Sequence, residues 1–272
     1  MLTLKAALRQ AYGDLRPQVL GPGILAMIIP GAMILLLFND KADNIEANDL
    51  ASLIVAGVIG SFSALVVMQI GAEYYADRIG GALLRVRILP NGPLVWGIGK
   101  AISAISVMFF TQALLIFGSI FLLPSSPVTW SNVWLMLGIA LLADVAAAPL
   151  GFILGALVRG TYTQIAAYVG IMGLMMTSGF AMSITSLWRW LQILQSALPF
   201  YWAGQLSRHA AGMSEDWELG HAFNIPLAVG ILLAWVIIGF ALVPVIMRYS
   251  FRKESIGSLA RIQSTTRSQL GM

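Results

Sequence analysis

The 272-residue chain contains 58% hydrophobic and only 10% charged residues, and its mean hydropathy is +0.84. So few polar side chains cannot cover a water-soluble domain, which excludes an ordinary soluble protein and indicates a bilayer environment. The net charge of +4 does not indicate a nucleic-acid partner, because the basic residues do not gather with stacking aromatic residues. The chain has no cysteine, which excludes disulfides and cysteine-based metal sites.

Residues 1–17 are patterned as an amphipathic helix that does not span the membrane. Its apolar residues share one arc of a helical wheel and its basic residues share another. The apolar arc holds Leu4, Ala7, Leu8, Ala11 and Leu15, and the basic arc holds Lys5, Arg9 and Arg16. This pattern favours a helix on the inner membrane surface, and a frayed cytosolic tail is the alternative.

Six apolar segments predict an all-α, polytopic integral membrane protein with six transmembrane helices. Each segment is close to the roughly twenty residues that a helix needs to cross a hydrocarbon core of about 30 Å. They cover residues 22–38, 51–71, 98–123, 132–158, 165–187 and 225–247. The expected organisation is an interfacial helix over 1–17, a six-span domain over 18–247 and a basic cytosolic tail over 248–272.

Lysine and arginine are unevenly distributed between the predicted loops. Most of the sixteen lie before the first span, after the second, after the fourth and after the sixth, whereas the loop after the first span is acidic. Because cytoplasmic loops retain lysine and arginine, both termini are expected on the cytoplasmic side.

The loop over 73–92 predicts a short cytosolic helix between the second and third spans. Its pattern is helical from Tyr74 to Ile88. Gly80 and Gly81 each weaken a helix by about 1 kcal/mol relative to alanine, which indicates either a bend there or close approach to another backbone. Pro90 and the residues after it turn the chain back toward the membrane.

The segment over 188–222 is too polar to cross the bilayer but rich in aromatic residues. Trp188, Trp190, Tyr201 and Trp202 are of the ring types that settle at a membrane interface. We expect one or two short re-entrant helices on the extracellular side, partly sunk into the outer leaflet and broken near Pro199. Interfacial anchoring alone also explains each single tryptophan.

Two stretches of the chain carry characteristic residues at defined spacing. The first stretch carries Asp77, Arg78, Gly81, Leu83, Arg85 and Pro90, followed by Gly99 and Lys100. The second stretch carries Ser178, Gly179, Trp190, Leu191, Leu198, Pro199, Phe200, Tyr201, Leu206 and Arg208. In residue type and spacing, both stretches resemble the permease subunits of type 2 ABC exporters, the group that includes daunorubicin-type drug efflux permeases. The first stretch departs from the family at Ile79, Gly80 and Ala82.

The resemblance implies a bacterial cell-membrane permease that pairs with a second copy or a related permease and binds two cytosolic ABC ATPase subunits. The loop over 73–92 would contain the coupling helix that docks on the ATPase. The residues implied in coupling are Glu73, Asp77, Arg78, Gly81, Leu83, Arg85, Arg87 and Pro90. A solvated basic loop is the alternative interpretation of these charges.

No phosphate-binding GxxxxGK[ST] loop is present in the sequence. ATP and Mg²⁺ are therefore expected on the partner subunit. No cofactor or metal is expected on this chain, which would be a transport subunit and not an enzyme.

Residues inside the fourth and fifth spans are candidates for the substrate path. Asp144 lies in mid-span, where a carboxylate costs about 2.5–3.5 kcal/mol, so it is expected to contact cargo, carry a proton or hydrogen-bond another helix. Ala147, Gly151 and Gly155 form a small-residue stripe that favours helix packing. An adaptable apolar surface in the fifth span would suit lipophilic cargo, although lipid-facing or core positions explain the same residues: Tyr168, Met172, Met176 and Phe180.

The sequence thus favours outward export of a lipophilic or amphipathic drug, natural product or lipid. Export of a lipid-linked polysaccharide by the same machinery is one alternative. A proton-coupled secondary transporter is another, but it would need a relay of ionisable groups where Asp144 stands alone. A membrane enzyme is disfavoured, because the sequence has neither HExxH nor GxSxG. Membrane lipids are expected partners, and nucleic acid is not.

Overall fold

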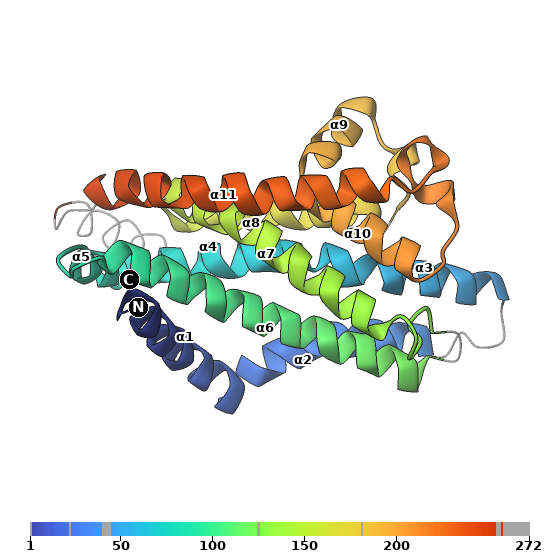
Figure 1. The fold of residues 1–272 in the computed structure, drawn as a ribbon, viewed down its shortest axis with the longest axis horizontal. Helices are drawn as coiled ribbons and strands as arrows, with labels where there is room; N and C mark the ends of the chain where they lie inside the picture. The colour runs from blue at the N-terminus through green and yellow to red at the C-terminus, as the bar shows by residue number, and fades with distance from the viewer. Residues whose placement is uncertain are drawn as a thin grey trace.

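The computed structural model describes residues 2–21, 23–39, 45–123, 126–180, 182–253 and 257. These residues form α-helices and short irregular helical turns, with no strand among them, in agreement with the predicted all-α class (Figure 1). The bundle helices are α2 (Gly23–Asn39), α3 (Ile45–Ser61), α4 (Ser63–Ile79), α6 (Gly92–Leu122), α7 (Val133–Leu157), α8 (Thr161–Met175) and α11 (Ile225–Lys253). The remaining helices are α1 (Leu2–Leu20), α5 (Ala82–Arg87), α9 (Arg189–Ala197) and α10 (Pro199–Ala210). Most of the predicted tail over 248–272 lies outside the described residues.

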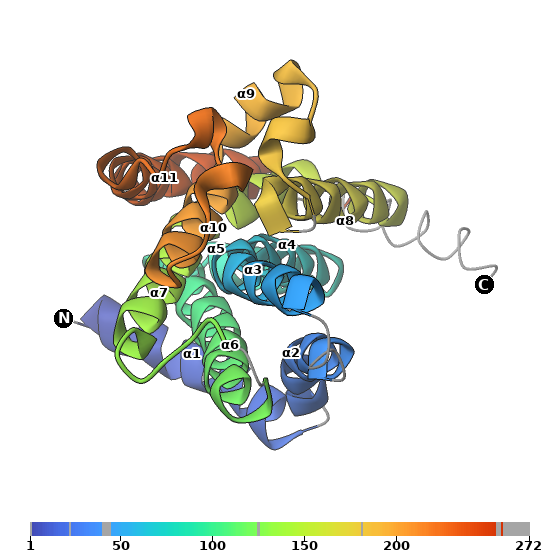
Figure 2. The ribbon, with the colours of Figure 1, turned by 90° about the vertical axis from the view of Figure 1, so that its right-hand side faces the viewer.

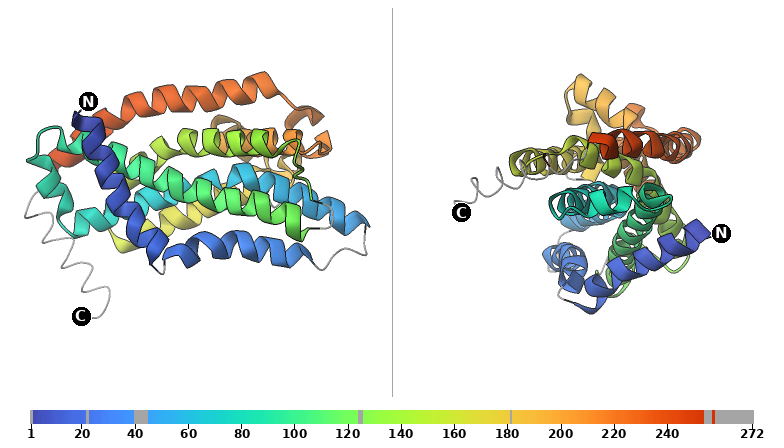
Figure 3. Two further views of the ribbon diagram at one scale, coloured as in Figure 1. Left: turned by 60° about the horizontal axis from the view of Figure 1, so that its bottom comes forward. Right: turned by 90° about the vertical axis from the view of Figure 1, so that its left-hand side faces the viewer.

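Within the described residues, four stretches are long and apolar enough to cross a membrane. They are Ser52–Ile79, Gly92–Leu122, Val133–Leu157 and Ile225–Phe251, and they contain most of the second, third, fourth and sixth predicted segments. The shorter helices α2 and α8 run alongside them in the bundle (Figure 1, Figure 3). The chain is therefore a multi-pass membrane protein.

The second apolar stretch ends later than the sequence predicted. Helices α3 and α4 follow each other with only Phe62 between them, and α4 continues to Ile79. No helix breaker stands between Gly71 and Ile79, and Tyr74 and Tyr75 are buried by the neighbouring helices. The predicted short helix over 74–88 is therefore wrong at its start, since only α5 lies beyond the bend.

Helices α4 and α7 pack closely at the centre of the bundle. A Cβ atom on Gly151 would lie 2.7 Å from the Ile70 Cβ, and one on Gly155 would lie 2.6 Å from the Tyr74 Cβ. Both distances are too short for a real side chain, so the two helices approach each other only because these positions are glycine. The stripe predicted to favour packing does so against α4.

Helix α1 lies obliquely across one end of the bundle and packs against α6 and α2 (Figure 3). Its alanines Ala7 and Ala11 are buried against the bundle, whereas Leu4 and Leu8 are exposed. The predicted single apolar arc therefore divides into a bundle-facing half and an outward-facing half. The outward half suits contact with lipid.

Helices α9 and α10 lie at the opposite end of the molecule (Figure 2). The break predicted near Pro199 is present, because α9 ends at Ala197 and α10 begins at the proline, the position that helix starts tolerate best. Helix α10 packs into the bundle against α3, α7 and α11, and its Phe200 is fully buried. Helix α9 protrudes and leaves Trp188 exposed.

Candidate coupling site

The candidate site is the connection between α4 and α6, at the bundle end that also holds α1 and the C-terminal end of α11 (Figure 1). Gly81 starts the connection with φ +70 and Asn91 ends it with φ +54, both in the left-handed region. Hydrogen bonds from Leu89 N to Val86 O (3.2 Å) and from Gly92 N to Leu89 O (3.0 Å) close the turn after α5. The connection is thus a compact turn and not an open loop.

Helix α5 has an inner and an outer side. Leu83 is buried in the bundle core, whereas Arg85, Arg87 and Pro90 are exposed. Directly after α5, Ile88 is 82% exposed and Leu89 is 58% exposed. Two arginines beside two large apolar side chains at a bundle tip are typical of a protein interface. Ile88 and Leu89 were not among the residues implied in coupling, although two apolar residues between arginines and a turn are a signal that the sequence contains.

Arg78 does not belong to this surface. It is only 2% exposed, and its Nη1 donates to the Gly155 carbonyl oxygen (3.1 Å) and to the carbonyl oxygen of Val158. Its Nη2 donates to the Ser250 Oγ (3.3 Å). Arg78 therefore joins α4 to the last carbonyls of α7 and to α11, where a cation also meets the negative end of the helix dipole. Arg78 is therefore not available for a direct docking contact of the kind that the resemblance implied, because other helices of this chain cover it.

Glu73 and Asp77 also point inward, toward a lysine. The Lys100 Nζ lies 3.1 Å from Asp14 Oδ2, 3.1 Å from Glu73 Oε2 and 3.4 Å from Asp77 Oδ2. We call Asp14, Glu73, Asp77 and Lys100 the Lys100 cluster. It joins α1, α4 and α6, and its three carboxylates face a single ammonium group.

Neighbouring polar groups hold the carboxylates of the Lys100 cluster in place. Trp96 Nε1 donates to Asp77 Oδ2 (2.7 Å), and Gln69 Nε2 donates to Glu73 Oε1 (3.1 Å). A Cβ atom on Gly99 would lie 3.2 Å from the Ala7 carbonyl oxygen, so the glycine lets α1 approach closely. The Gly99–Lys100 pair noted in the sequence therefore has two physical roles: the glycine makes room for α1 and the lysine binds it.

Asp144 is fully buried between helices α3, α6 and α7. Gln112 Nε2 donates to Asp144 Oδ1 (3.1 Å) and also to the Ile59 carbonyl oxygen (3.0 Å). Of the three roles considered for Asp144, hydrogen bonding to another helix is the one that this geometry displays. Its carboxyl group is not accessible from the surface of the single chain.

The candidate residues of the fifth span lie elsewhere, on α8. Met172 and Met176 are exposed, and Tyr168 is partly buried and accepts a hydrogen bond at its hydroxyl from Gln164 Nε2 (2.7 Å). The side chain of Phe180 lies outside the described part of the chain. The structure therefore does not bring these residues together with Asp144.

A buried ion pair at the opposite end was not predicted. Arg208 Nε lies 2.6 Å from Glu218 Oε1, and Arg208 Nη1 donates to the Gly179 carbonyl oxygen (2.9 Å). The Tyr201 hydroxyl donates to Glu218 Oε2 (3.0 Å). Burial, together with the Glu218 carboxylate, raises the pKa of Tyr201 above its usual range, so the hydroxyl remains a donor.

Arg208 also joins two parts of the second family-like stretch, Gly179 and α10, that lie far apart in the sequence. Gly179 has φ +86, and a Cβ atom there would lie 2.9 Å from Arg208 Nη2. The Ser-Gly pair at the end of the fifth span and the arginine of α10 are thus in direct contact. The contact fastens α10 and the segment after it to the bundle.

The described residues form an all-helical, multi-pass membrane bundle with a compact turn between α4 and α6 at one end and the packed helix α10 at the other. The sequence model of the ABC-2 type transporter family matches residues 4–211. The match covers most of the chain, from α1 to the end of α10, so the chain belongs to the ABC-2 type transporter family. Membership makes it a transport subunit that partners with an ABC ATPase subunit. The comparison with individual curated proteins finds no match.

Proposed function

We propose that the chain is the transmembrane subunit of an ATP-driven exporter in a bacterial cell membrane, and that α5 and the residues after it dock on a separate ATPase subunit. The observation that carries the proposal is the exposed tip formed by Arg85, Arg87, Ile88 and Leu89, held between two long membrane helices. Two ATPase copies would bind ATP and Mg²⁺, one for each permease of a pair.

The contacts behind the tip suggest how motion would spread from it. A push on α5 reaches α4 and α6 directly, because short turns connect them. The Lys100 cluster passes the motion to α1, and Arg78 passes it to α7 and α11. ATPase closure would thereby move a connected set of helices and repack the bundle.

We propose six spans, with α2 and α8 completing the set. The 17 residues of α2 extend about 25 Å and the 15 residues of α8 about 22 Å, somewhat less than the hydrocarbon thickness of about 30 Å, and the chain continues beyond α8 through the kinked turn over Met176–Phe180. The end that carries α1 and α5 would face the cytosol, since it collects most of the lysines and arginines. Both termini would then be cytoplasmic, and α9 and α10 would be extracellular.

Cargo is proposed to move along a face shared by two permeases. Helices α2 and α8 flank α3 and α4 on one side of the bundle (Figure 2). Each carries a stripe of exposed apolar side chains: Leu25, Ile29, Met33 and Leu36 on α2, and Tyr162, Ile165, Val169, Met172 and Met176 on α8. A second copy or a related permease would cover these stripes. Methionines adapt to varied shapes, which suits a lipophilic or amphipathic drug, natural product or lipid.

Copurification tests the docking proposal. The permease is purified in mild detergent with its ATPase, and Ile88→Asp/Leu89→Asp is compared with Leu4→Asp/Leu8→Asp, which changes two exposed leucines of α1. Loss of two interface anchors costs about 1 kcal/mol or more each, so we expect ATPase binding to weaken about tenfold or more. Arg85→Glu/Arg87→Glu is expected to act in the same direction. Retained binding and unchanged ATPase coupling in both tip variants would falsify the docking assignment.

A further inference from the structure

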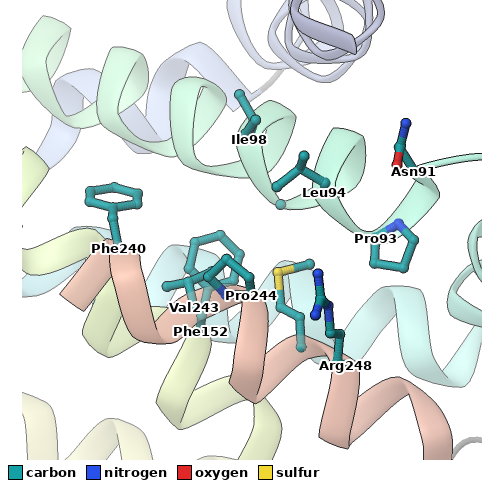
Figure 4. A pocket seen from close by; sticks show the side chains of 11 residues that line it. Asn91, Pro93, Leu94, Ile98, Phe152, Phe240, Val243, Pro244 and Arg248 are labelled. Atoms are coloured by element: carbon teal, nitrogen blue, oxygen red, sulfur yellow. The ribbon is translucent and has the colours of Figure 1, made fainter. Parts of the chain in front are cut away.

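A groove opens between α6 and α11 at the end of the bundle that carries α5 (Figure 4). Its cavity volume is about 380 Å³. The walls are apolar and are formed by Leu94, Gly97, Ile98, Phe152, Phe240, Val243, Pro244 and Met247. Asn91 and Arg248 lie together at one end, because α6 starts where α11 ends.

The polar end of the groove is suited to an anion. Arg248 is exposed and extends from α11 toward Pro93 and Asn91 (Figure 4). It has no ion-pair partner within the described part of the chain. A guanidinium group binds phosphate oxygens through two parallel N–H donors, and the Asn91 side chain lines the same end of the groove.

The apolar walls are suited to a hydrocarbon chain. Helix α11 is the least buried of the four long membrane stretches, with 17% of its most apolar window buried inside the protein. The groove therefore opens on a helix that faces lipid. An apolar channel that ends in a cation and an amide matches a ligand with an acyl chain and an anionic head.

We infer that this groove binds an anionic phospholipid of the inner leaflet. Arg248 and Asn91 hold the headgroup phosphate, and one acyl chain lies between α6 and α11. The inference rests on the proposed orientation, in which this end of the bundle faces the cytosol. The bound lipid would fill the space beside α11 and support the helix that Arg78 joins to α4.

The chain's own C-terminal residues are a poorer occupant. The last fifteen residues contain Arg261 and Arg267 and no acidic side chain, so their charge repels Arg248. Exported cargo is also disfavoured, because the exposed stripes of α2 and α8 lie on other helices. An anionic lipid satisfies both ends of the groove.

The test measures lipid retention by the purified permease without the ATPase, using native mass spectrometry and added dioleoyl-phosphatidylglycerol or dioleoyl-phosphatidylcholine. The wild type should retain the anionic lipid more strongly. Arg248→Gln should weaken retention of phosphatidylglycerol about fivefold and that of phosphatidylcholine less, because the choline cation already offsets the phosphate charge of phosphatidylcholine. An unchanged melting temperature in detergent shows that the variant is folded. Arg189→Gln, an equal loss of charge at the opposite end, should behave as wild type.

A second pair of variants tests the acyl-chain part of the groove. Leu94→Trp fills the groove and should reduce retention of both lipids, whereas Ile237→Trp on the exposed side of α11 should not. Equal retention of the two lipids by the wild type, or equal losses in Arg248→Gln and Arg189→Gln, would overturn the inference. Displacement of phosphatidylglycerol by inorganic phosphate would identify a free-phosphate site instead. Neither result depends on ATPase docking, so failure here and failure of the proposed function are separate outcomes.

Discussion

The ammonium group of Lys100 lies 3.1 Å from the carboxylate of Asp14, which fastens α1 to α6, the helix that follows α5 in the chain. Glu73 and Asp77 of α4 share the same ammonium. The Lys100 side chain is only 10% exposed, so solvent and salt screen its interactions with the carboxylates less than they screen a surface ion pair. This cluster is the main electrostatic connection between α1 and the bundle.

Removal of Lys100 should destabilise the permease. Lys100→Met leaves three neighbouring carboxylates without a cation, and the cost should be near the lower end of about 3–5 kcal/mol because the carboxylates keep some solvent contact. Thermal unfolding in detergent measures the effect, with Lys5→Met on the exposed face of α1 as control. Adding Asp14→Asn and Glu73→Gln to Lys100→Met should restore part of the loss. An unchanged melting temperature for Lys100→Met would contradict the role of the cluster.

Enlargement of Gly155 should separate α4 from α7. Gly155→Val places side-chain atoms inside the Tyr74 ring region and should cost about 1–3 kcal/mol, as overpacked cores do. Gly138→Val on the same helix is the matched control, since no atom lies within 4 Å of a Cβ there. Equal stability losses for the two variants would show that helix propensity, and not packing, governs position 155.

Substitution of Arg78 should change the stability of the permease, whereas substitution of an exposed α5 arginine should change ATPase binding. Arg78→Gln removes hydrogen bonds to carbonyl groups at the C-terminal end of α7 and to Ser250, so it should lower the free energy of unfolding by about 1–3 kcal/mol. The affinity of the folded fraction for the ATPase should change little. Arg85→Glu should instead weaken ATPase binding and leave the free energy of unfolding nearly unchanged, since this side chain is exposed. Unfolding curves and ATPase binding, measured on the same preparations, distinguish the two; a specific binding defect in folded Arg78→Gln would contradict this assignment.

The buried pair at the other end should tolerate loss of its carboxylate poorly. Glu218→Gln leaves the Arg208 guanidinium buried without a counter-charge, at a cost of about 3–5 kcal/mol. Glu215→Gln, an exposed acid three residues earlier, should have an effect close to zero. Limited proteolysis between residues 188 and 222 reports local release of α9 and α10. Equal protease resistance in the two variants would show that the ion pair does not hold this segment.

Features that depend on neighbouring residues were predictable from the sequence. The apolar runs indicated the long membrane helices, Gly81 and the Pro90 turn marked the limits of α5, and Pro199 marked the break between α9 and α10. Each of these signals acts within a few residues of the chain, through side-chain hydrophobicity or restrictions on φ.

Only the tertiary structure decided which polar groups face inward and what they meet. Arg78, Arg85 and Arg87 are similar in the sequence, but α7 and α11 bury Arg78, whereas Arg85 and Arg87 remain exposed. Asp14 meets Lys100 across 86 positions of the chain, a pairing that helical periodicity cannot reveal. Local sequence sets where helices begin and end, whereas the close approach of distant helices sets which charges are removed from water and must find partners.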